Sequence, residues 1–285
     1  TAPEMDLSER HLGLTTPSDA PQGSGFVRAV GARIAQSVDL DRLLEVAWTA
    51  PECVGTGPNR ASPEMTHKLR IGIARDEAFA FYYPDDLEAF AAAGAELVPI
   101  DMLRDTALPD IDGLFIGGGF PEVHAAALAA NAQMRESIRN ALEAGLPAYA
   151  ECGGLMYLCR SLRWRNETHP MVGFIEADAV MHDRPQGRGY VRFTRESPAL
   201  WPFADNEQRA HEFHYASLEN MAAPVFARRV TRGYGIDGRH DALVKCNTQA
   251  GFIHLRHSSQ SPWVTDFLKF VAATRKHAAA QKRSS

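Results

Sequence analysis

The stretch Pro147-Ala-Tyr-Ala-Glu-Cys-Gly-Gly-Leu-Met-Tyr-Leu158 decides the fold of this chain. Residues 147–150 have the composition of a short buried strand and lead into Cys152 and two glycines. An apolar segment follows at 155–162, with leucines spaced to share one side of a helix. A strand that turns sharply into a helix between small residues is a nucleophile elbow, which holds one side chain above the strand ends. We therefore predict that Cys152 lies on such a turn.

The position of Cys152 also predicts a reactive thiol. The N-terminus of a following helix favours thiolate over thiol, which makes the sulfur a nucleophile near neutral pH. The alternative is that Cys152 is a small buried apolar residue, as most free cysteines are. The glycine pair directly after it, at a strand-to-helix junction, favours the nucleophile.

Strand and helix patterns alternate upstream of this stretch, which predicts an open, mostly parallel α/β sheet with flanking helices. The expected strands are 69–74, 96–100 and 113–116, and the expected helices are Asp85–Ala93, Val123–Ala130 and Met134–Ala144. Downstream of Met171, short segments separated by turn residues predict antiparallel strands that extend the sheet in the C-terminal half. These segments are Ala177–Met181, Gly189–Thr194 and Val225–Val230, followed by a strand Gly251–Leu255 and a helix Pro262–His277.

Residues 1–67 differ in composition from the domain that opens at Lys68. A segment rich in Pro, Ser, Thr, Asp and Gly precedes a helical pattern over Phe26–Val46, and Pro51–Thr66 is a turn-rich linker. The first residue is Thr1, which suggests a piece of a longer protein. We expect the compact domain to cover 68–277, with 278–285 as a disordered tail.

Charge and composition exclude several classes of function. The formal net charge is -5 and no basic stripe is interleaved with aromatics, so we expect no nucleic-acid partner. No apolar run reaches the roughly 18 residues of a membrane span, so no membrane partner is expected. The four cysteines match neither a metal-binding pair nor a disulfide framework, which favours a soluble, cytoplasmic protein.

A glycine run follows the strand expected at 113–116. Gly117-Gly118-Gly119-Phe120-Pro121-Glu122 would lie at the carboxyl end of that strand, where ligands bind in such sheets. Successive glycine amides can point at one spot, so Gly118 or Gly119 with the amide of Gly153 could form an oxyanion hole. The alternative is a tight turn that binds nothing.

A nucleophilic thiol needs a base, and His254 is the best candidate. It lies in the apolar segment Gly251–Leu255 and would project at the end of that strand. A lone histidine in a strand is as readily structural as catalytic. The rival histidines are His257, His211, His214 and His240. Arg256 occupies the position two residues after His254 where an acid usually stands, so His254 is oriented from elsewhere or the site is a dyad.

Polar residues also cluster at 182–190 and in His211-Glu-Phe-His-Tyr215. The HEFH spacing does not place two histidines on one helical face as HExxH does, so no metal site is predicted. Arg184 and Arg188 could hold carboxylates by bidentate pairing, and the alternative is a solvated loop.

Together these motifs resemble the class I, Cys-type glutamine amidotransferase domain of the cobyrinic acid a,c-diamide synthase family. The resemblance is carried by Ala150–Leu158, Gly117–Glu122, His211–Tyr215, His254-Leu255 and Glu9-Arg-His-Leu-Gly-Leu14. It implies that glutamine is the nitrogen donor, that Cys152 forms a glutamyl thioester and that His254 is the base. Gly118 or Gly119 with Gly153 would support the oxyanion. The family itself tends to lack the acid after the histidine.

The resemblance further implies ATP-dependent amidation of carboxylates on a tetrapyrrole, with ATP and Mg²⁺ held by a synthetase domain. The chain contains no GxxxxGK[ST] loop, so we expect it to bind no cofactor itself. Residues 1–67 would then be the tail of an absent ATP-binding domain plus a linker. Arg184, Arg188, His211 and His214 are the expected tetrapyrrole contacts.

The stretches His182–Val191 and Tyr234–Asp241, with Arg256, look more like the family branch that amidates sirohaem-type tetrapyrroles. Two other interpretations remain. The chain could be a tetrapyrrole-binding or interaction module with an inactive glutaminase, or a cysteine hydrolase that acts on another acyl substrate.

Overall fold

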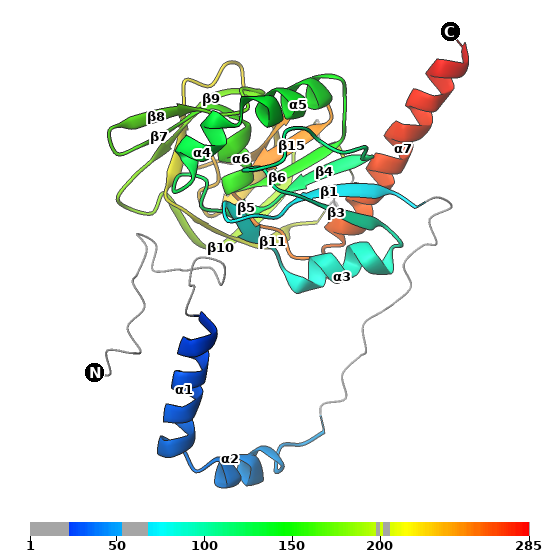
Figure 1. The fold of residues 1–285 in the computed structure, drawn as a ribbon. Helices are drawn as coiled ribbons and strands as arrows, with labels where there is room; N and C mark the ends of the chain where they lie inside the picture. The colour runs from blue at the N-terminus through cyan, green and yellow to red at the C-terminus, as the bar shows by residue number, and fades with distance from the viewer. Residues whose placement is uncertain (1–22, 53–67, 198–199, 202–205, 285) are drawn as a thin grey trace. The chain divides into compact units, whose positions relative to one another are not determined.

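The computed structural model describes residues 23–52, 68–197, 200–201 and 206–284, and the chain divides into two compact units (Figure 1). The motif Glu9–Leu14 and most of the predicted linker lie outside the described residues. The first unit contains α1 (Gly23–Ser37) and α2 (Leu40–Ala47) instead of one helix over Phe26–Val46. The break has a local cause, because the Asp39 side chain accepts a hydrogen bond from the Arg42 amide and thereby caps α2.

The second unit is built on a nine-stranded sheet in the order β11-β10-β13-β14-β15-β6-β4-β1-β3. Its members are β1 (Arg70–Ala74), β3 (Glu96–Ile100), β4 (Gly113–Ile116), β6 (Ala148–Glu151), β10 (Gly187–Arg195), β11 (Gln208–His214), β13 (Phe226–Arg232), β14 (His240–Lys245) and β15 (Thr248–Gly251). The strands from β15 to β3 pair in parallel, and those from β15 to β11 pair antiparallel. The predicted α/β class, with an antiparallel extension in the C-terminal half, is confirmed.

A separate four-stranded sheet corrects two expectations. It contains β7 (Cys159–Trp164), β8 (Glu167–Pro170), β9 (Ile175–Met181) and β12 (Ala216–Glu219). The segment Ala177–Met181 is a strand, but it belongs to this sheet and does not extend the main one. The helix expected through residue 162 ends at Leu158, and Leu162 lies on β7. Pairing with β8 and β9 overrides the helical spacing of the leucines.

The main sheet is covered on both faces by apolar side chains that alternate along its strands. Leu114 and Ile116 face the cluster that includes α4 (Ala125–Ala130), α5 (Ala132–Glu143), α6 (Gly153–Leu158) and the smaller sheet. Phe115 belongs to the opposite cluster. Helices α3 (Pro84–Ala92) and α7 (Trp263–Ser284) cover that face of the sheet (Figure 1).

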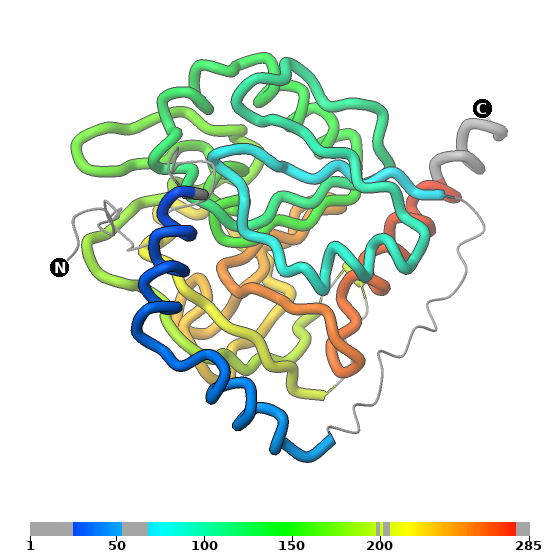
Figure 2. Tube along the Cα trace, turned by 60° about the horizontal axis from the view of Figure 1, so that its bottom comes forward, coloured from blue at the N-terminus to red at the C-terminus, as the bar shows by residue number. Residues whose placement is uncertain are grey.

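Helices α3 and α7 lie beside one another on that second face, as Figure 2 also shows. Helix α7 continues to Ser284, so the segment 278–284 expected as a disordered tail is helical. Within the described ranges, no helix combines the length and apolarity that crossing a bilayer requires.

The order of the strands brings the predicted site residues to one edge. Strands β15, β6 and β4 are parallel neighbours, and they end at Gly251, Glu151 and Ile116. Cys152 and Gly117 are the next residues after β6 and β4. Crevices at the carboxyl ends of such strands bind ligands in open α/β sheets, so this edge is the candidate site.

Candidate active site

Cys152 occupies the turn between β6 and α6, as predicted. Its φ of 49° lies in the left-handed region, which is uncommon for a residue with a β-carbon. Two backbone hydrogen bonds fix the turn: the Cys152 amide donates to the Gly251 carbonyl (2.8 Å), and its carbonyl accepts from the Met156 amide (3.1 Å). A β-carbon on Gly154 would lie 2.3 Å from the Ile116 carbonyl oxygen, so glycine is required there. The predicted position of Cys152 on a sharp strand-to-helix turn is confirmed.

His254 reaches this turn from beyond the end of β15. The strand expected over Gly251–Leu255 is wrong in its bounds: β15 covers Thr248–Gly251 and stops there, because its partner β6 ends at the elbow. His254 instead forms an isolated bridge with His211 on β11, in which its amide donates to the His211 carbonyl (2.9 Å). Its side chain is 12% exposed.

Two consecutive residues contact the His254 imidazole. The Cys152 side chain lies beside it and acts on its charge, and Glu151 Oε2 lies 3.5 Å from its Nδ1 atom. Burial alone would lower the pKa of His254, but the hydrogen bonds and negative charges of Cys152 and Glu151 raise this pKa to about 10. The imidazole of His254 is therefore held as an imidazolium at neutral pH.

The glycine run Gly117–Gly119 lies beside both Gly153 and His254. Strand β5 (Gly118–Gly119) pairs with β2 (Phe79–Phe81), and the Gly117 amide donates to the Tyr82 hydroxyl (3.0 Å). A β-carbon on Gly153 would lie 3.0 Å from the Gly119 nitrogen. The backbones of Gly119 and Gly153 therefore approach closely enough for both amides to serve one oxyanion.

The turn before β2 is hydrogen-bonded to Phe120, the residue directly after the glycine run. One carboxylate oxygen of Asp76 accepts from the amides of Ala78 (2.7 Å) and Phe79 (3.0 Å). The Ala78 carbonyl in turn accepts from the amide of Phe120 (2.9 Å). Burial raises the pKa of Asp76 to about 6 despite these amide hydrogen bonds.

His211, expected to contact the tetrapyrrole, lies next to the proposed base. Its ring stacks on that of His254 with centroids 5.0 Å apart, and the Tyr83 hydroxyl lies 3.0 Å from its Nδ1 atom. Burial and the positive charge of His254 lower the pKa of His211. A neutral His211 therefore lines the rim of the site beside a charged His254.

The other three expected tetrapyrrole contacts lie in different surroundings. His214 is buried, with its ring stacked on Phe252 at 4.0 Å and its Nδ1 atom 2.8 Å from the Ala216 carbonyl oxygen. Arg184 and Arg188 are exposed, the latter on β10. The structure thus gathers His211 with Cys152 and His254, whereas His214 is enclosed.

The rival bases have other partners. His257 Nδ1 accepts from the Val264 amide at the start of α7 (3.3 Å), and His240 Nδ1 pairs with Asp237 at 2.9 Å. Arg256, in the place of the usual acid, pairs with Asp85, with Nε 2.8 Å from Oδ2. The residue that sequence reasoning missed is Glu151, whose only signal was an acid directly before the expected nucleophile.

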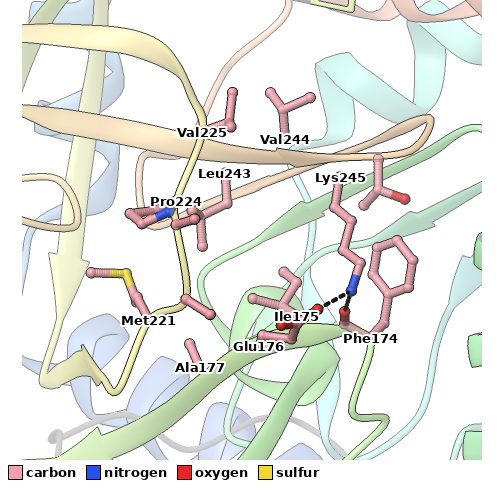
Figure 3. A pocket seen from close by; sticks show the side chains of 13 residues that line it. Phe174, Ile175, Glu176, Ala177, Met221, Pro224, Val225, Leu243, Val244 and Lys245 are labelled. Atoms are coloured by element: carbon pink, nitrogen blue, oxygen red, sulfur yellow. Dashed lines mark hydrogen bonds and ion pairs between the residues drawn. The ribbon is translucent and has the colours of Figure 1, made fainter.

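A cavity of about 200 Å³ lies elsewhere, between the β14–β15 hairpin and the start of β9 (Figure 3). Lys245 points toward it and donates to the Phe174 carbonyl and to Glu176, both at 2.8 Å. Thr248 lines the cavity at the opposite end of β15 from Gly251, so the cavity is separate from the candidate active site. In the described part of the chain, no group of three or more His, Cys, Asp or Glu residues is arranged to hold a metal.

Comparison with known proteins gives relatives over nearly the whole chain. It is 39% identical to cobyrinate a,c-diamide synthase of Magnetococcus marinus over 274 residues, which cover 94% of this chain and 58% of that protein. It is 38% identical to the enzyme of the same name from Archaeoglobus fulgidus over 266 residues, covering 93% and 58%. The chain therefore spans a little under three fifths of the length of these relatives.

A solved structure shares the fold of this chain, and one family model matches most of its second unit. The structure of PurLQS from Thermotoga maritima superposes with a TM-score of 0.55 at 14% identity. The superposition covers 73% of this chain and 99% of that one, and it shows a shared fold. The model of the CobB/CobQ-like glutamine amidotransferase domain matches residues 70–262. The chain therefore belongs to the family of CobB/CobQ-like glutamine amidotransferase domains.

Proposed function

We propose that this chain is the glutaminase part of an ATP-dependent amidotransferase that amidates carboxylate side chains of a tetrapyrrole. The observation that carries the proposal is the contact of Cys152, on its left-handed turn, with the His254 imidazole. A thiol in that position and a buried imidazolium are the two groups that thioester chemistry on an amide requires.

The site supports a two-step hydrolysis of glutamine. The Cys152 thiolate adds to the amide carbon of glutamine. The oxygen of the tetrahedral intermediate accepts hydrogen bonds from the amide of Gly153 and from that of either Gly118 or Gly119. His254 gives its proton to the departing nitrogen, the carbon–nitrogen bond breaks, and ammonia leaves a glutamyl thioester. Neutral His254 then takes a proton from water, which attacks the thioester and releases glutamate and the thiolate.

The ammonia would be used by a synthetase domain. The relatives are named cobyrinate a,c-diamide synthases, and this chain matches 58% of their length. We place ATP and Mg²⁺ on a synthetase domain outside this chain, where a carboxylate is activated as an acyl phosphate that ammonia attacks. Residues 1–67 would be the end of that domain with its linker, and residues 68–277 the glutaminase.

Two tetrapyrrole classes are candidates for the acceptor. The names of the relatives favour a corrinoid such as cobyrinate. A sirohaem-type acceptor is favoured by Arg256 and by the stretch His182–Val191, in which Arg184 and Arg188 are exposed. Amide formation by the intact protein with each acceptor, followed by mass spectrometry, distinguishes the two.

The glutaminase proposal is tested with a diazoketone analogue of glutamine, which alkylates a reactive thiolate within a glutamine-binding site. Peptide mapping should place the added mass on Cys152, and free glutamine should protect this residue. An unlabelled Cys152 would favour an interaction module with an inactive site. Labelling without protection by glutamine would favour a hydrolase for another acyl substrate.

A further inference from the structure

We propose that Glu151 is the third member of the catalytic centre, a positioning residue that orients His254 from the position directly before the nucleophile. The inference rests on the proposed function, because it gives His254 the role of acid and base. No acid stands in the usual position after the histidine, where Arg256 pairs with Asp85 instead.

Both carboxylate oxygens of Glu151 are engaged around the imidazole. Oε2 lies 3.5 Å from His254 Nδ1, and Oε1 accepts from the amide of Leu255 at 2.9 Å. The side chain is 4% exposed. Because the same carboxylate holds the ring of His254 and the backbone of the next residue, it fixes both the position and the rotation of the imidazole.

The left-handed turn explains how neighbouring residues can share one partner. Successive side chains of a strand point to opposite faces, so residues 151 and 152 of a continued strand would diverge. Cys152 has a φ of 49°, which ends the alternation and turns its side chain toward the imidazole that Glu151 already contacts. The strained backbone thus lets two consecutive residues act on one ring.

A buried chain of polar side chains, which begins at the Tyr149 hydroxyl, holds the Glu151 carboxylate in place. The Tyr149 hydroxyl donates to Glu151 Oε1 at 2.7 Å and accepts from Arg228 at 3.0 Å. Arg228 also pairs with Asp241 at 3.3 Å, and Asp241 accepts from the Phe252 amide at 2.9 Å. Since the guanidinium occupies the acceptor side of the phenol, the phenol proton is directed to Glu151.

The chemical role follows from the charges that face His254. They come from Glu151 and Cys152 at the end of β6, and from His211 on β11 with the Tyr83 hydroxyl behind it. Of these groups only the first two are acids that can place a negative charge beside the imidazole, and the sulfur of Cys152 is consumed when the thioester forms. The carboxylate of Glu151 therefore remains beside Nδ1 through the step in which His254 transfers its proton.

The test compares Glu151→Gln and Tyr149→Phe with two controls in the full chain. Glutamine keeps the volume and an acceptor for the Leu255 amide but removes the charge. Phenylalanine removes only the hydroxyl that holds Glu151. Tyr157→Phe deletes a buried hydroxyl without a hydrogen-bond partner among the described residues, and Asp266→Asn removes a buried carboxylate on α7.

Carbon-13 NMR of labelled histidine, with the His254 signal assigned by His254→Ala, reports the role directly. We expect His254 in Glu151→Gln to titrate at least about one pH unit below its wild-type value, with a smaller shift in the same direction for Tyr149→Phe. The controls should titrate as wild type does. For turnover of glutamine, kcat should fall about tenfold or more in Glu151→Gln while KM stays within about threefold.

A wild-type titration of His254 in both Glu151→Gln and Tyr149→Phe would overturn the proposal, as would an equal shift in the controls. If Glu151→Gln does not fold, Tyr149→Phe alone decides by the same criterion. The glutaminase assignment fails separately, when the glutamine analogue leaves Cys152 of the wild type unlabelled, because the NMR titration requires no glutamine.

Discussion

A β-carbon on Gly118 would lie 2.9 Å from Cε1 of His254, so the glycine run and the proposed base are in direct contact. Gly118→Ala should therefore push the imidazole away from Cys152. We expect glutamate release to fall about tenfold or more, because small displacements of reacting groups are costly. The measurement is steady-state glutamate production. Gly31→Ala on α1, where a β-carbon meets no atom within 4 Å, is the control and should retain the wild-type rate.

Gly119→Ala should act through stability instead. Its β-carbon would lie 1.9 Å from the Ala78 carbonyl oxygen, which is backbone and cannot move aside as a side chain would. We expect a loss of roughly 1–3 kcal/mol in the free energy of unfolding, measured by urea denaturation. A Gly119→Ala variant as stable as wild type would contradict the close pairing of β5 with β2.

Cys152→Ala should abolish glutamine-dependent amidation by the intact synthetase and leave ammonia-dependent amidation in place. In the proposed function the thiol only liberates ammonia, and a synthetase domain activates the acceptor. Amide formation is measured with each nitrogen source. Cys159→Ala and Cys246→Ala should each keep glutaminase turnover within about tenfold, since neither thiol lies on the elbow. Equal loss of both activities in Cys152→Ala would overturn the division of labour.

His254→Ala should lower glutaminase turnover by about 10²-fold or more, the usual contribution of a general acid–base group. His257→Ala should change it far less, because His257 contacts the start of α7. The assay is glutamate release at saturating glutamine. A larger effect at His257 than at His254 would show that the base is misassigned.

Asp86→Asn should change how stability depends on pH. Burial, with the nearby charges of Glu151 and Asp85, raises the pKa of Asp86 to about 7. The folded state binds this proton more tightly than the unfolded state, so the stability it contributes is full below about pH 4 and is lost as the pH rises to about 7. Asparagine keeps the Oδ1 acceptor for the His257 amide and the Trp263 indole without the charge.

Urea denaturation at pH 4.5 and pH 8 measures this difference. The gain of Asp86→Asn over wild type should grow with pH, by up to about 3 kcal/mol between the two conditions. Asp85→Asn, at an exposed carboxylate, is the control. A pH dependence unchanged in Asp86→Asn would show that Asp86 ionises normally.

Local patterns were sufficient to predict where Cys152 and the glycine run lie. Apolar strands that end in glycines or at an elbow are legible in the sequence, and parallel neighbours such as β4 and β6 bring their carboxyl ends together. The position of His254 near the same edge was predicted for this reason too, although the strand expected at 251–255 lies at 248–251. The bridge to His211 that holds it is a contact between distant segments, which spacing does not reveal.

Three other features depended on contacts between segments distant in the sequence or on backbone conformation. The segment Cys159–Trp164 follows a helix and contains residues that favour helices, but pairing with β8 and β9 makes it a strand. The orientation of Glu151 depends on the positive φ of Cys152, a backbone state that a cysteine does not signal. The buried Tyr149–Arg228–Asp241 chain joins residues from three strands, so it too was beyond the reach of local patterns.

Tyr149 stands between Glu151 and two tryptophans. Its ring centroid lies 5.0 Å from that of Trp263 and 5.4 Å from that of Trp201, and both indoles are 1% exposed. Trp48 is 85% exposed. Buried indoles emit at shorter wavelengths than hydrated ones. Trp201 and Trp263, next to Tyr149, should therefore emit at shorter wavelengths than Trp48. Entry of water beside these two indoles would shift their emission to longer wavelengths, which can be measured without any added label.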